Sequence, residues 1–326
     1  MCFIVFVFIC EYYALFDDKE NAMRVKEYDQ HRSWIEIDLQ ALRHNVRQFL
    51  KVLQNKEQLM AVVKADAYGH GAVAVAKELN RIGITSFAVA TLAEAIELRQ
   101  NEIQGDILIL GYTCPCDAHL LQKYNLIQTV IDYPYALSLQ KQEKSLRVHI
   151  AIDSGMHRLG ETREHMASLL QIKQLNNLHV EGIFSHLCVC DELSKESQEY
   201  TYLQIQQFQE IVQYMQEKGI SFSKIHLLSS YGLLHYQDYL FDYVRMGILM
   251  YGVDSCEPQQ SYFDLKPVLS LKSKVAMIKN VSKNETIGYG RTYLTKKITK
   301  IAIVPIGYAD GIPSNSSLFH PTSFSP

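Results

Sequence analysis

Short apolar runs alternate with amphipathic stretches over most of the chain, from residue 59 to residue 252. The apolar runs are continuous, which is typical of strands buried on both faces of a parallel sheet. The stretches between them have helical periodicity, and the longest ends at Gly219, a residue type that commonly ends helices. The pattern predicts eight strands, at residues 59–65, 86–90, 106–111, 127–132, 146–153, 179–187, 224–230 and 243–252.

Eight strands with intervening helices predict an α/β protein built on a (β/α)₈ barrel of the TIM type. A doubly wound open sheet is the alternative, because strand count alone does not establish closure. After Tyr251 the pattern changes to short strands without helices, which indicates a small β domain. We therefore expect an N-terminal extension and polar linker (1–32), the barrel (33–264) and a small, incomplete β domain (265–326).

Both ends of the chain are unusual. Residues 1–10 are uninterrupted apolar, but a helix needs about 20 such residues to cross a bilayer. This run is therefore either the last part of a membrane helix or a simple apolar extension. The last residues are rich in Ser and Pro without periodicity, and no charged side chain follows Asp310. This composition predicts that the β domain is cut short.

Charge and cysteine content exclude several classes of protein. The 32 basic and 35 acidic residues give a net charge of -3, which argues against a nucleic-acid partner. Seven cysteines without a repeating framework indicate a reduced, cytoplasmic protein rather than a disulfide scaffold. The two C-x-C pairs, Cys114 with Cys116 and Cys188 with Cys190, are weak zinc signals without matching second pairs. We expect no metal.

Polar side chains gather where the predicted strands end. In a parallel barrel the carboxyl ends of the strands form the active site, and a core strand has no structural reason to end repeatedly in such groups. The pattern therefore predicts a site. The residues concerned are Lys64, the turn from Asp153 to Arg158, His186, Ser229, Ser230, Arg245 and Gly247.

Lys64 is the candidate nucleophile or base. An apolar run leads up to it, and burial at the mouth of a barrel lowers the pKa of a lysine. An isolated lysine there would more simply be a strand-end residue whose amine reaches solvent. Lys64 has specific neighbours, however: Tyr68 is four residues away, and glycines at 69 and 71 allow tight turns.

The segment VVKADAYGHG, residues 62–71, resembles the cofactor-lysine signature of alanine racemases. The motifs DSGMHRLGE, FSHL, SSYGLL, RMGILMYG, IGYGRTY and PIGYADG follow in the family's order, so the resemblance runs from residue 33 to 311. MHRLGE and SSYGLL are most similar to the membrane-linked serine/alanine racemases of vancomycin-resistance clusters. The resemblance therefore implies a membrane domain before this chain and a position at the cytoplasmic face of the membrane.

The resemblance also implies pyridoxal 5'-phosphate as the cofactor. Lys64 would hold it covalently, Tyr68 would contact its phosphate, and His186 would pack beside its ring. Arg158 would donate to its phenolic oxygen and help to hold the substrate carboxylate. The hydroxyl of Ser230 and the backbone N–H groups of Gly247 and Ile248 would complete the phosphate site.

Arg245 would face the pyridine nitrogen. An arginine does not give up its proton, so the ring would stay neutral and side reactions of the carbanion would be discouraged. Racemisation needs acid–base groups on opposite faces of Cα. The family pattern assigns these roles to Lys64 and to Tyr289 of a partner subunit, which implies a homodimer with shared sites. Without the motif, Tyr289 would be an ordinary strand tyrosine. Tyr308 would line the substrate entrance.

Three departures from the family pattern bear on function. Ala151 stands where many relatives have a modified lysine that supports the arginine, and Ser229 replaces a common asparagine. The family's later methionine–aspartate segment and last active-site tyrosine have no counterpart here. The resemblance implies an isomerase that interconverts L- and D-alanine, L- and D-serine, or both. A catalytically impaired fragment and a cofactor-carrier protein are the alternatives, and Arg245 argues against a decarboxylase.

Overall fold

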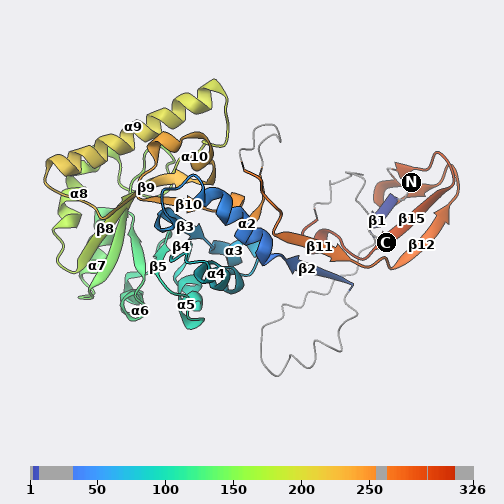
Figure 1. Ribbon diagram of the computed structural model, residues 1–326, viewed down its shortest axis with the longest axis horizontal. Helices are drawn as coiled ribbons and strands as arrows, with labels where there is room; N and C mark the ends of the chain where they lie inside the picture. The colour runs from blue at the N-terminus through green and yellow to red at the C-terminus, as the bar shows by residue number, and fades with distance from the viewer. Residues whose placement is uncertain (1–2, 7–31, 255–262, 292, 313–326) are drawn as a thin grey trace. The chain divides into compact units, whose positions relative to one another are not determined.

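The computed structural model describes residues 3–6, 32–254, 263–291 and 293–312 (Figure 1). The chain divides into two compact units. One is Asp38–Val268, and the other combines the residues up to Ile37 with those from Leu269 onward. Each unit has its own sheets.

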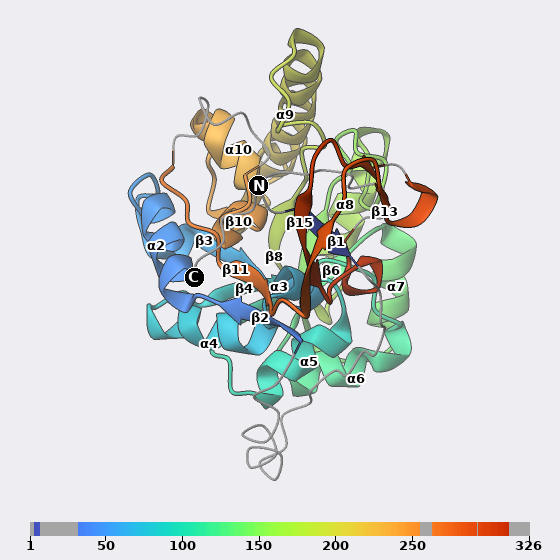
Figure 2. The ribbon, with the colours of Figure 1, turned by 90° about the vertical axis from the view of Figure 1, so that its right-hand side faces the viewer.

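The first unit is a closed barrel of eight parallel strands, visible end-on in Figure 2. The closed barrel is thus confirmed over the open sheet. Consecutive strands pair in chain order, and β10 closes the ring against β3. The strands are β3 (Leu59–Val62), β4 (Ser86–Val89), β5 (Asp106–Ile109), β6 (Ile127–Val130), β7 (Leu146–Ala151), β8 (Leu178–Phe184), β9 (Lys224–Ser229) and β10 (Tyr243–Met246).

Helices surround the barrel because each βα connection returns the chain to the same end of the next parallel strand. They are α2 (Leu39–Leu50), α4 (Ala72–Arg81), α5 (Leu92–Gln100), α6 (Ala118–Lys123), α7 (Tyr133–Gln140), α8 (Met166–Lys173), α9 (Lys195–Glu217) and α10 (Ser230–His235). Short 3₁₀ turns are η1 (Lys56–Gln58), η2 (Pro115–Asp117), η3 (Arg163–His165), η4 (Gln237–Tyr239) and η5 (Ile248–Tyr251).

The barrel interior is packed with side chains. Met60, Val62, Ala88, Leu108, Ile127 and Tyr243 form one buried cluster contributed by β3, β4, β5, β6 and β10. Side chains cap the amino ends of α2, α5, α7 and α9; at α2 the Asp38 carboxylate accepts the backbone N–H groups of Gln40 and Ala41. Apolar burial on this scale stabilises the fold by roughly 25 cal/mol per Å² of surface removed from water.

All eight predicted strands extend past the observed carboxyl ends, by one to six residues. The run 243–252 was expected to be one strand, but β10 ends at Met246 and Ile248–Tyr251 form η5. The reason is Gly247, whose φ of -117° and ψ of -109° turn the chain away from the sheet. Similarly, the strand expected at 59–65 ends at Val62. An apolar run alone does not show where hydrogen-bonded pairing stops.

The second unit consists of short sheets. Strand β2 (Ser33–Ile37) is antiparallel to β11 (Leu269–Ser273), so residues 33–37 pair here although we expected them in the barrel domain. Strand β15 (Thr299–Val304) lies between β12 (Met277–Val281) and β1 (Phe3–Phe6). A small hairpin joins β13 (Thr286–Ile287) to β14 (Tyr293–Leu294) through η7 (Tyr289–Arg291), and η8 (Tyr308–Asp310) follows β15.

The apolar N-terminal run thus contributes β1, a parallel partner of β15. Within the described residues, none of the helices combines the length and apolar character needed to span a bilayer.

Candidate active site

A cavity of about 420 Å³ opens at the carboxyl ends of the barrel strands. Its walls come from the ends of β3, β4, β5, β7, β8, β9 and β10 and from the residues that follow them. The structure brings together at this cavity all eight barrel residues that the sequence singled out. They are Lys64, Tyr68, Arg158, His186, Ser230, Arg245, Gly247 and Ile248.

Lys64 begins a left-handed turn, the segment α3 (Lys64–Gly69). The four residues from Ala65 to Tyr68 all have φ between 51° and 55°, which is the left-handed region. For each non-glycine residue, the left-handed conformation costs about 1–2 kcal/mol relative to the right-handed helical region. Strain of this kind concentrates at functional sites. The turn places Lys64, which is half-buried, and Tyr68 on the same cavity wall.

Two carboxylates hold this turn in place. Glu94 accepts the backbone N–H of Ala65 at 2.7 Å through Oε1, and those of Ala90 and Thr91 at 2.6 and 3.0 Å through Oε2. Asp66 accepts the N–H of Ala72 at 2.6 Å. Glu94 therefore ties the turn after β3 to the turn after β4. Sequence reasoning missed it, although T-x-x-E before a helix is a readable capping-box signal.

Tyr68, Ser230 and Gly247 form a small polar recess. A Cβ atom on residue 247 would lie only 2.9 Å from the hydroxyl of Tyr68, so this approach requires glycine. The N–H of Gly247 donates to the Ser230 hydroxyl at 2.9 Å. Burial raises the pKa of Tyr68, which keeps its hydroxyl protonated and able to donate. The hydroxyls of Tyr68 and Ser230 can donate to an anionic oxygen group in this recess.

Arg245 is buried with no carboxylate among its partners in the described structure. Its Nη2 donates to the carbonyl oxygens of Ser185 (2.6 Å) and Leu227 (3.0 Å), and its Nη1 to Nδ1 of His226 (2.9 Å). The ring of Phe184 lies 5.3 Å from the guanidinium carbon. Burial, with Arg158 nearby, lowers the pKa of Arg245 to about 9, so it still carries its proton at neutral pH. Phe184 was not predicted from the sequence.

His186 faces a group of cations. Burial is the main reason that its pKa falls to about 3, and the charges of Arg245, Arg158 and Lys64 lower it further. The ring is therefore neutral. Nδ1 of His186 lies 3.2 Å from Nη2 of Arg245, whose hydrogens also meet the carbonyl oxygens of Ser185 and Leu227.

Arg158 lies at the mouth of the cavity on the turn after β7. The Asp153 carboxylate shapes this turn by accepting the N–H groups of Gly155 and His157, and His157 has φ of 55°. Arg158 itself is exposed, so its guanidinium remains accessible to a charged ligand. Ala151 also lines the cavity and offers no polar group to Arg158.

The two remaining predicted residues lie in the second unit. Tyr289 occupies η7 in the β13–β14 hairpin, and its side chain is 84% exposed. Tyr308 begins η8, and its side chain lies outside the described part of the chain.

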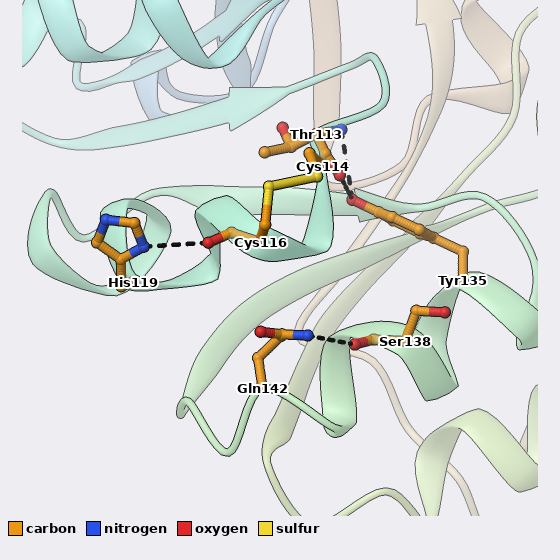
Figure 3. Close-up of a disulfide and its surroundings, with 7 residues drawn as sticks. All are labelled: Thr113, Cys114, Cys116, His119, Tyr135, Ser138 and Gln142. Carbon is orange, nitrogen blue, oxygen red and sulfur yellow. Dashed lines mark hydrogen bonds between the residues drawn. A yellow bond between two sulfur atoms is a disulfide. The ribbon is translucent and has the colours of Figure 1, made fainter.

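The four cysteines in the described part of the chain are not among the residues that line the cavity. The structure joins Cys114 and Cys116 in a disulfide, which differs from the expected reduced state (Figure 3). The turn η2 brings their Cα atoms to 5.3 Å, within the usual range for a disulfide. Their ligand atoms also lie within 4.8 Å of a carboxylate oxygen of Asp117, but disulfide sulfurs offer no thiolate to a metal ion. Cys190 is buried, and burial raises the pKa of its thiol to about 11.

Comparisons with known proteins agree with this architecture. Residues 37–255 match the N-terminal domain of alanine racemase, and residues 268–322 match its C-terminal domain. An amino-acid racemase of Enterococcus faecalis is 43% identical over 87% of this chain and 41% of its own length. A serine/alanine racemase of Enterococcus gallinarum is 42% identical over 86% of this chain and 40% of its own length. An alanine racemase structure from Clostridium difficile 630 superposes with a TM-score of 0.80 at 35% identity, covering 89% of this chain and 77% of that one.

The fold and cavity define a (β/α)₈ barrel with its site at the carboxyl ends of the strands, followed by a β unit. With two domain matches and relatives at this level of identity, the chain belongs to the alanine racemase family. It spans less than half the length of the two Enterococcus relatives.

Proposed function

We propose that this chain racemises a small amino acid, alanine, serine or both, with pyridoxal 5'-phosphate held at Lys64. Family membership supports the reaction class. The observation that carries the proposal is the convergence of the eight predicted residues on one cavity with a lysine at its wall.

The cavity suits the cofactor in three respects. The recess of Tyr68, Ser230 and Gly247 offers donors for a phosphate, and a Cβ at residue 247 would obstruct it. Arg245 lines the cavity with a buried guanidinium that carries its proton at neutral pH and suits an acceptor such as a pyridine nitrogen. The Lys64 amine is available for covalent attachment. When bound, the cofactor delocalises the negative charge that develops at Cα as its proton leaves.

The chain's own residues would hold the substrate and move its proton. Arg158, exposed at the cavity mouth, binds the substrate carboxylate. Lys64 takes or returns the Cα proton on one face, and Tyr289 serves the opposite face. Neutral His186 keeps additional positive charge away from the reacting centre.

Tyr289 would be supplied by a second copy of the chain, so the active form would be a homodimer. Its 84% exposure supports this, because a proton-transfer group works best when shielded from bulk water. The serine/alanine racemase and amino-acid racemase names of the relatives support a small substrate but leave the choice between serine and alanine to experiment.

The test is Lys64→Ala, with Lys195→Ala as the matched control on the exposed start of α9. The unaltered chain and the control should take up the cofactor stoichiometrically, show the absorption band of lysine-bound cofactor, and racemise L-alanine or L-serine. Lys64→Ala should lose both the band and the activity. A band that persists in Lys64→Ala contradicts the assignment. Cofactor binding without turnover of either amino acid would indicate a carrier protein instead.

A further inference from the structure

A line of buried hydrogen bonds runs from Arg245 across the barrel interior. Nη1 of Arg245 lies 2.9 Å from Nδ1 of His226, and Nε2 of His226 lies 3.0 Å from Nδ1 of His149. Both imidazoles are at most 1% exposed. The three residues lie on β10, β9 and β7, so the line crosses three strands and ends away from the cavity, whose lining includes Arg245 but neither histidine.

The donor and acceptor properties of the side chains determine which group donates in each of these hydrogen bonds. Arginine only donates, so Nδ1 of His226 must be the unprotonated nitrogen of its ring. The proton of neutral His226 is then on Nε2, where it is donated to Nδ1 of His149. Mainly because both rings are buried, the pKa of His149 falls to about 3 and the pKa of His226 falls well below its usual value. Both rings are therefore neutral.

The barrel is built to accommodate the ring of His149. Gly182 of β8 is the registered neighbour of His149, and a Cβ at residue 182 would lie 2.8 Å from three atoms of the imidazole. Its φ is not in the left-handed region, so backbone conformation does not explain the glycine. The ring of His226 stacks on Phe184 at 4.8 Å and 14°, and Phe184 also lies against Arg245.

We propose that His149 is a positioning residue: by accepting the N–H of His226, it fixes the ring orientation that presents Nδ1 to Arg245 and so holds the guanidinium at the cavity. Without this acceptor, the buried N–H of His226 would have to turn toward another partner, and Arg245 would lose one of its acceptors. The importance of this placement for the cofactor ring rests on the proposed function. The hydrogen-bonded line itself does not.

The experiment records two-bond ¹H–¹⁵N spectra of the histidines, first without cofactor and then with pyridoxal 5'-phosphate bound. In the unaltered chain, His226 should be neutral with its proton on Nε2. His149→Phe removes the acceptor but keeps a ring, and His226 should then show a mixture of tautomers. His149→Asn retains an acceptor near the position of Nδ1 and should restore the original pattern.

Two further variants keep the test decisive if His149→Phe folds poorly. Gly182→Ala should displace the His149 ring and change the His226 signals in the same way. Thr129→Val removes a buried hydrogen bond to the carbonyl of Ile109 elsewhere in the barrel, and should leave those signals unchanged. An unaltered His226 pattern in both His149→Phe and Gly182→Ala overturns the proposal.

The cofactor provides the second readout. His149→Phe should weaken cofactor affinity by about 10-fold, the lower end of what supporting hydrogen bonds contribute around a bound group, and His149→Asn should recover most of it. Equal losses in His149→Phe and Thr129→Val would mean that His149 only contributes packing, which also overturns the proposal. If the unaltered chain binds no cofactor while the tautomer results hold, the proposed function fails and the hydrogen-bonded line stands.

Discussion

The two units of this chain hold their candidate functional residues in opposite ways. In the barrel, Arg245 and Ser230 are buried and fixed by several hydrogen bonds, and a clamped left-handed turn carries Lys64. In the second unit, Tyr289 occupies a turn between two strands of two residues each, and its side chain is 84% exposed. The barrel residues are therefore held in place before any ligand binds, whereas the hairpin exposes Tyr289 to solvent.

This contrast separates two tasks. In the proposed function, cofactor binding would need only groups that the barrel brings together, whereas proton transfer on the second face of Cα would need Tyr289 of the second unit. Changes in the barrel should therefore alter cofactor binding or stability. Changes in the hairpin should alter turnover alone.

The largest expected effect is that of Tyr289→Phe. Losing a general acid–base group typically lowers the rate by about 10²- to 10⁴-fold, so kcat should fall by that much. Cofactor affinity, measured by absorbance titration, should not change. Tyr293→Phe, in the same hairpin, is the control and should retain activity. If Tyr289→Phe weakens cofactor binding as much as it slows turnover, the separation of tasks is wrong.

Gly247→Ala should weaken cofactor affinity by about 10-fold, because overpacking by one methyl typically costs 1–3 kcal/mol. The added Cβ would press against the hydroxyl of Tyr68. Fluorescence or absorbance titration measures the effect. In a Tyr68→Phe background, Gly247→Ala should weaken cofactor affinity clearly less, because the hydroxyl that the added Cβ would meet is absent. An equal cost in both backgrounds would refute the steric explanation.

Glu94→Ala should lower the free energy of unfolding by about 1–3 kcal/mol, the usual cost of leaving buried or capping donors unpaired. Its carboxylate supports both the turn after β3 and the start of α5. Urea denaturation measures the loss, and Glu97→Ala on the exposed side of α5 is the control. Similar small losses in both variants would show that the turn does not depend on Glu94.

The smallest effect concerns pH. Burial lowers the pKa of His149 to about 3, whereas an unfolded histidine titrates near 6.5. The unfolded chain therefore binds a proton that the folded barrel excludes, and stability falls as pH drops below about 6.5. One such histidine contributes up to about 1.4 kcal/mol per pH unit down to the folded pKa. Urea denaturation at several pH values should show a shallower slope for His149→Asn, and an unchanged slope would contradict the buried, neutral ring.

Much of the barrel could be predicted because buried parallel strands have continuous apolar runs. The gathering of Lys64, His186 and Arg245 at one cavity was also predictable, since carboxyl strand ends converge and these are polar residues in apolar surroundings. The left-handed turn was not predictable, because Ala65, Asp66 and Ala67 have no preference for positive φ. It depends on long-range clamping by Glu94.

Side-chain contacts between different strands could not be predicted from the sequence. Nothing in the residues around His149 shows that it meets His226, which is 77 positions away, because strand register decides that contact. The role expected for Tyr289 came from family resemblance alone, and no periodicity in its hairpin would have distinguished it from neighbouring tyrosines.

The most direct test of the account is to mix two inactive proteins, Lys64→Ala and Tyr289→Phe, under conditions that let subunits exchange. In a dimer with shared sites, each hybrid has one site with both residues intact. Statistical mixing of a two-fold symmetric dimer should therefore restore about one quarter of the unaltered activity. If mass spectrometry shows that hybrid dimers form and racemisation stays absent, Lys64 and Tyr289 do not meet across two chains, and the central claim is wrong.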